Sequence, residues 1–265
     1  MNGSRLGKWV RRAAAILLLG LVLGGAALYL LASWLPSDYH PAALPFEERT
    51  IAAQKFIRKM VDLTNDWQRG GPFALSFTEA ELNACLASMD EIAAFDPNGS
   101  PGDVHRLMDR AGLAGPAAAV HDGVLTLMVR LKDYGKVISA DLSFEFLPTG
   151  NLRVHLEAVR VGRLPVPAWL YRSRLGELRQ ALASRAGRKP ASPGSEGHPR
   201  AGVSVEDVST VLSRVIAAID EEPVPAYLPA RIRGRVARVD RIDLRNQALT
   251  IHFQPVAAAA LDRPR

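Results

Sequence analysis

The fold is decided by residues 124–160, which read VLTLMVRLKDYGKVISADLSFEFLPTGNLRVHLEAVR. Apolar and polar residues alternate along three runs, which Asp133-Tyr134-Gly135 and Pro148-Thr149-Gly150 separate. Successive side chains of a strand point to opposite faces, so the pattern predicts three strands of an antiparallel meander with one apolar face. The apolar face would hold Leu125, Leu127, Val129, Leu131, Ile138, Ala140, Leu142, Phe144, Phe146, Leu152, Val154, Leu156 and Ala158.

Helical patterns precede the meander. Apolar residues recur at helical spacing over 47–67, and Gly70-Gly71-Pro72 is a typical helix end. After a short extended stretch, Thr78 and Glu81 have the spacing of a capping box that opens a second helix. Asn83 lies inside that helix among apolar residues, so we expect its amide to bond backbone groups of a neighbouring strand or loop.

Further turn, helix and strand patterns precede and follow the meander in the sequence. His121-Asp122-Gly123 indicates a hairpin turn before the first long strand. We expect helices at about 168–186 and 204–220, and a closing hairpin whose two strands meet across Asn246-Gln247. Together these elements predict an α+β fold, with a curved antiparallel sheet packed on helices.

The N-terminal segment 13–35 is uncharged and predominantly apolar. A membrane-spanning helix needs about 20 such residues, and basic residues mark its cytoplasmic side. The segment therefore predicts an uncleaved single-pass anchor with a cytoplasmic N-terminus and an extracytoplasmic domain. A cleaved signal peptide is the alternative, but its best site, after Ala32, has the large Leu30 at the −3 position. The basic residues before the segment are Arg5, Lys8, Arg11 and Arg12.

These patterns divide the chain of 265 residues into successive parts. We expect a disordered loop inside the extracytoplasmic domain at 187–202, which reads GRKPASPGSEGHPRAG and has almost no apolar residues to bury. The expected parts are a cytoplasmic N-terminus at 1–12, the anchor at 13–35, an extended stalk at 36–46, the domain at 47–256 and a flexible tail at 257–265.

Composition narrows the possible functions. The formal net charge is +6, and four positive residues precede the anchor, so the charge gives no support for nucleic-acid binding. The single cysteine, Cys85, excludes an intrachain disulfide, and its apolar helical context favours a small buried side chain over a reactive thiol. The histidines are scattered, and the sequence has no zinc, Walker, Rossmann or nucleophile-elbow motif. We therefore expect neither a cofactor nor a metal, and no enzymatic activity.

Three patches carry a resemblance to a known family. They are Phe77-Thr78-Glu79-Ala80-Glu81-Leu82-Asn83, Val161-Gly162-Arg163-Leu164-Pro165-Val166-Pro167 and the closing Phe253-Gln254-Pro255. In these patches and in their order, the chain resembles the YpmS-like family of bacterial single-pass membrane proteins, which has no established activity. The resemblance implies a membrane-tethered envelope domain that handles lipid or another apolar ligand. The loop at 187–202 departs from the family pattern.

A one-sided apolar sheet can be filled by its own helices or can line a ligand cavity. The leading expectation is a binding protein for lipid or another apolar envelope component, and the alternative is an interaction module that docks another envelope protein. Arg231, Arg233 and Arg235 would share one strand face and could contact lipid phosphates. The wider basic cluster adds Arg238, Arg241 and Arg245, and it could instead form a solvated strand face balanced by Asp240 and Asp243. The candidates for a cavity wall are Leu127, Val129, Ala140, Leu142, Phe144 and Leu156, with Val154 on the same predicted face.

Overall fold

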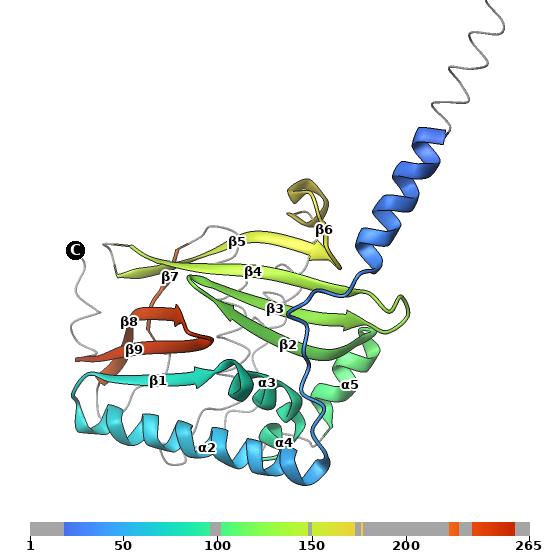
Figure 1. Ribbon diagram of the computed structural model, residues 1–265. Coiled ribbons are helices and arrows are strands. Elements are labelled where there is room, and N and C mark those ends of the chain that lie inside the picture. Colours follow the sequence, from blue (N-terminus) through green and yellow to red (C-terminus); the bar gives the residue numbers. More distant parts are fainter. Residues whose placement is uncertain are drawn as a thin grey trace, which may run out of the picture.

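The computed structural model describes residues 19–95, 102–147, 150–172, 176, 223–227 and 235–257. It contains two antiparallel sheets with helices packed against them, which confirms the predicted α+β class (Figure 1). One sheet has the strand order β2-β3-β4-β5-β6, and the other has the order β1-β9-β8. The sequence predicted a single sheet, because alternation reports which residues share a face and not which strands pair.

The meander forms the larger sheet, as predicted. Residues 132–136 form its β3–β4 turn and residues 162–163 its β5–β6 corner, and both lie at the same end because the strands alternate in direction. A bulge between Asp141 and Leu142 shifts the β4–β5 register. The strands are β2 (Leu113–His121), β3 (Val124–Leu131), β4 (Val137–Phe146), β5 (Asn151–Val161) and β6 (Leu164–Pro165).

The smaller sheet pairs strands from the two ends of the domain. Phe73 in β1 lies opposite Phe253 in β9, and their rings stack with centroids 5.1 Å apart. The β8–β9 hairpin turns at Asn246 and Gln247, both with positive φ, as the closing hairpin predicted. The strands of this sheet are β1 (Phe73–Thr78), β9 (Ala248–Ala257) and β8 (Arg235–Arg245).

The long helix α2 (Phe46–Arg69) covers this smaller sheet (Figure 1). It ends at Gly70, which adopts φ of 83°. Trp67 is buried against Phe253 and Ala237, so the last turns of α2 supply much of the core here. The remaining helices are α3 (Glu79–Ala87), α4 (Met89–Ala93) and α5 (Asp103–Arg110).

A short segment links the two sheets. Strand β7 (Val224–Pro225) pairs with β5, and two residues later Tyr227 forms an isolated bridge with Arg238 of β8. Val239 N also donates to Ala226 O at 2.7 Å. Residues 223–227 therefore join β5 to β8 and make the two sheets one continuous hydrogen-bonded surface.

Helix α3 covers the edge of the larger sheet that β2 forms. Its capping box is formed as predicted, with Thr78 Oγ1 accepting from Glu81 N and Glu81 Oε2 accepting from Thr78 N. The Asn83 amide donates to Ala118 O at 2.8 Å and accepts from Ala118 N at 2.7 Å. The expected role of Asn83 is confirmed, because a helix side chain here satisfies backbone groups of a neighbouring strand.

The segment expected to be a stalk instead lies against the larger sheet. Tyr39 is buried, packs with Ala117 and Met128, and donates from its hydroxyl to Gly115 O at 2.8 Å. This packing also corrects the predicted wet face of the meander, since Thr126, Met128 and Ser139 are buried. A strap from the N-terminal side covers part of a face that alternation alone assigns to solvent.

The apolar N-terminal helix is described over residues 19–33, and its apolar side chains are largely exposed. Within the described part of the chain, no helix combines the length and hydropathy needed to cross a membrane. Of the helix expected at 168–186, the structure describes residues 168–172 as helical. The helix expected at 204–220, the loop at 187–202 and most of the tail lie outside the described residues.

Candidate apolar binding face

The structure brings the predicted cavity-wall residues together on one face of the larger sheet, which we call the apolar face. The strand register sets its residues in rows that run across the strands. These rows are Val129–Ile138–Val161, Leu127–Ala140–Val159, Leu125–Leu142–Leu156, Phe144–Val154 and Phe146–Leu152. The prediction that these side chains share a face is therefore confirmed. Ala158, also predicted on this face, lies opposite Asp141 on the other one, because the bulge shifts the β4–β5 register.

The burial of the apolar face is uneven. Leu142 and Val154 are buried and form a core with Phe144, Leu156 and the linking residue Val224. Leu127, in the middle of β3, is 42% exposed. The half of the face around Leu142 and Val154 is thus a filled core. The half around Leu127 is open enough for a ligand to contact it.

The opposite face carries a buried charge. Asp141 is buried and accepts a hydrogen bond from Thr126 Oγ1 at 2.9 Å. Arg160, next to it on β5, forms an ion pair with the other carboxylate oxygen. Both oxygens of Asp141 therefore have partners, as a carboxylate buried in a sheet requires.

The apolar face begins where the apolar N-terminal helix meets the sheet. Its first row ends at Val161, and the next residue, Gly162, lies against the last turn of that helix. A Cβ atom at Gly162 would stand 2.6 Å from Ala32 O and 2.7 Å from Trp34 O. Only glycine fits this approach, and it also supplies the φ of 60°. Composition and periodicity gave no signal for this contact, although Gly162 belongs to the second patch of the resemblance.

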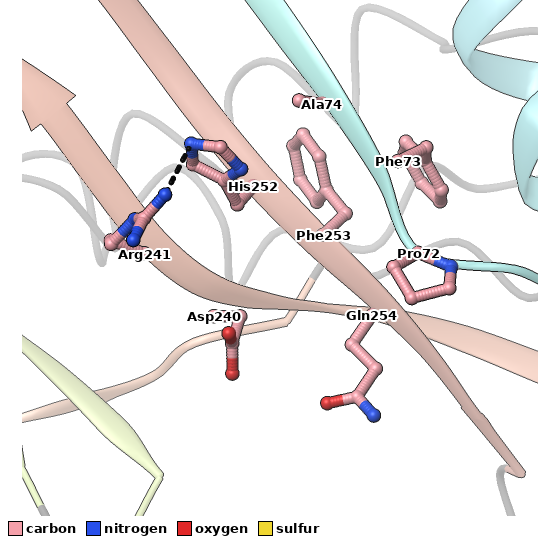
Figure 2. A pocket seen from close by; sticks show the side chains of 8 residues that line it. All are labelled: Pro72, Phe73, Ala74, Asp240, Arg241, His252, Phe253 and Gln254. Atoms are coloured by element: carbon pink, nitrogen blue, oxygen red, sulfur yellow. Dashed lines mark hydrogen bonds between the residues drawn. The ribbon is translucent and has the colours of Figure 1, made fainter.

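A separate pocket of about 550 Å³ lies over the smaller sheet (Figure 2). Phe73 and Phe253 form its apolar side, and Arg241 and His252 lie side by side at its polar side. Asp243 pairs with both of these groups, 3.0 Å from Arg241 Nε and 2.9 Å from His252 Nε2. The Asp243 carboxylate balances the charge of Arg241, as on a solvated strand face.

One of the three predicted headgroup arginines lies within the described residues. Arg231 and Arg233 lie outside the described residues, and Arg235 is the first residue of β8, opposite Ala257. Further along the strand, Arg238 lies 3.7 Å from Asp240, and Arg241 pairs with Asp243. Both contacts are of the kind expected of a solvated face balanced by Asp240 and Asp243, and lipid contact by Arg231, Arg233 and Arg235 stays a prediction.

A second hollow of about 330 Å³ runs between α2 and α3, and its lining includes Ile51, Phe56, Phe77 and Cys85. Burial raises the pKa of the Cys85 thiol to about 11. The thiol is therefore protonated at neutral pH and a poor nucleophile, as its apolar context predicted.

The described residues contain no group of three or more His, Cys, Asp or Glu side chains placed to hold a metal ion. No protein-family model, curated protein or solved structure matches the chain. The resemblance to the YpmS-like family therefore stays a prediction.

Proposed function

We propose that the protein is a membrane-anchored extracytoplasmic binding protein, and that it holds lipid or another apolar envelope component on the apolar face. The supporting observation is the exposure of Leu127 on that face, where it lies opposite Ala140 and next to Val129 on the same side of β3. An apolar side chain in a central strand is ordinarily covered, and an open apolar patch is typical of a ligand or partner contact.

The anchor has support of its own. Leu21, Leu23 and Leu30 of the apolar N-terminal helix are each about three-fifths exposed or more. A helix that is apolar on all sides is stable when lipid or protein surrounds it, and the apolar run extends through residues 13–18. Because the Val129–Ile138–Val161 row adjoins this helix at Gly162, an acyl chain that leaves the bilayer would meet apolar side chains at once.

Native mass spectrometry of the full chain, purified from membranes, tests this function. We expect about one bound lipid per chain, and we expect Leu127→Asp to remove it while the melting temperature changes little, since Leu127 is partly exposed. The matched control is Val61→Asp on α2, where the side chain is 52% exposed and distant from the apolar face in the fold. A wild-type chain without bound lipid, or equal lipid loss in both variants, contradicts the proposal.

The second candidate function is docking of another envelope protein. The observation that favours it is a set of exposed apolar side chains along α2, namely Phe46, Ile51 and Val61. For this function Val61→Asp would abolish a cross-linked complex in native membranes, and Leu127→Asp would leave it intact. The same pair of variants therefore separates the two functions.

A further inference from the structure

A second surface of the domain surrounds the base of the apolar N-terminal helix. It lies at the end of the larger sheet that carries the β3–β4 turn and the β5–β6 corner (Figure 1). Its large side chains are well exposed: Trp34 by 60%, Tyr134 by 74% and Trp169 by 73%. With the partly exposed Leu170 and the basic residues Lys136 and Arg163, these side chains define the helix-base surface.

The helix is fixed to this surface by polar contacts as well as by Gly162. Arg163 N donates to Leu31 O at 2.9 Å, and the Arg163 guanidinium lies 5.1 Å from the Trp34 ring centroid. The Lys136 ammonium lies 4.4 Å from the Tyr29 ring centroid and bonds the Ser33 hydroxyl. These contacts come from both the turn and the corner, so they fix the direction of the helix relative to the sheet.

The composition of the helix-base surface is that of a membrane–water boundary. Tyrosine and tryptophan concentrate at the headgroup level, because each has an apolar ring and a polar tip. Basic side chains near the membrane surface are attracted to anionic headgroups. Residues 168–172 repeat this mixture within one helical turn, with Trp169 and Leu170 beside the exposed Arg172.

We propose that the helix-base surface lies in the phospholipid headgroup layer of the membrane that the helix enters, so that the domain is seated on the bilayer rather than held away from it. This inference rests on the proposed anchoring. It places the first row of the apolar face at the membrane boundary. It also places the opposite sheet end, at the β2–β3 turn, about 26 Å away along the eight residues of β3.

Depth measurements on the full chain test this seating. In a Cys85→Ser background, Tyr134→Cys places an environment-sensitive nitrobenzoxadiazole label on the β3–β4 turn, and Asp122→Cys places it at the far tip as the matched control. The chains are reconstituted into nanodiscs of phosphatidylethanolamine and phosphatidylglycerol that contain headgroup-level nitroxide lipids. We expect quenching at position 134 to be severalfold stronger than at position 122, with unchanged circular dichroism.

The outcomes distinguish this inference from the function on which it rests. Equally weak quenching at both positions, in discs that contain the chain, overturns the seating and leaves the anchor intact. A chain that does not enter the discs overturns the anchor and the seating together. Strong quenching at position 134 alone supports both.

Discussion

Asn83 holds the backbone of Ala118 through two hydrogen bonds, one from its amide nitrogen at 2.8 Å and one to its amide oxygen at 2.7 Å. One turn earlier on α3, Glu79 Oε2 accepts from Val120 N at 2.8 Å. Together the two side chains take the place of a missing strand along the edge of β2. They block pairing of this edge with another chain, which an open strand edge invites.

We predict that Asn83→Ala destabilises the domain by about 2–4 kcal/mol, because it leaves a buried N–H and a buried C=O of Ala118 without partners. Urea or thermal unfolding of the full chain in detergent measures the effect. Gln54→Ala, at an exposed position of α2, is the control and should change stability by less than about 0.5 kcal/mol. Equal stability of the two variants would show that water replaces the Asn83 amide.

The ion pair between the buried Asp141 and the partly exposed Arg160 gives a second prediction. Arg160→Gln leaves the carboxylate in a buried site without its counter-ion, and we expect a loss of about 3–5 kcal/mol. Arg153→Gln, on the same strand as Arg160, removes one partner of the exposed Glu145 and should cost less than about 1 kcal/mol. Unfolding of both variants under the same conditions gives the comparison, and a similar loss in each would show that Asp141 is solvated.

Gly162 allows a test of the contact between helix and sheet. We expect Gly162→Ala to lower the melting temperature and to expose the 34–45 segment to protease, because its Cβ would overlap backbone carbonyl oxygens. Gly123→Ala is a matched control, since its φ is also positive at 81° but its Cβ would meet open space. The control isolates the conformational cost, about 1 kcal/mol. If both variants lost the same stability, the close approach at Gly162 would be relieved by a small shift.

Glu81 should make stability depend on pH. The hydrogen bond from Lys59 is the largest cause that holds the pKa of Glu81 below its ordinary value of 4.5. Its stabilising contribution is therefore complete above pH 4.5 and is lost as the pH falls through the lower pKa of the folded state. The melting temperature of Glu81→Gln should lie below that of the wild type at neutral pH, and the gap should narrow in acid. If this difference in melting temperature did not change with pH, the effect of Glu81 would come from its capping hydrogen bonds and not from its charge.

Local pattern was enough to predict the strands of the meander, the capping box and the role of Asn83. Each depends on residues a few positions apart, where side-chain period or cap chemistry is decisive. The sequence also predicted correctly that Leu127, Ala140 and Leu142 share a face. How open each position is could not be predicted, because the exposure of Leu127 depends on which distant segments reach it.

Three features needed long-range information. From its sequence, the strap around Tyr39 was predicted to be a proline-rich stalk. The burial of Tyr39 depends on small residues such as Ala117, on a strand far along the chain. The two-sheet arrangement likewise depends on the pairing of β1 with β9, which no alternation pattern specifies. The contact at Gly162 belongs to the same kind, since it joins the N-terminal helix to a corner that follows the meander.

The pairing of Phe73 with Phe253 determines when the domain can be completed during synthesis. Strand β1 is among the first parts of the domain to be made, but its only neighbour in the described sheet order, β9, is among the last. Until β9 has been translated, α2 has no finished sheet beneath Trp67, and the apolar side of β1 is uncovered. Closing so long a loop is slow. A chain interrupted before β9 therefore loses the whole smaller sheet, and not only its last strand.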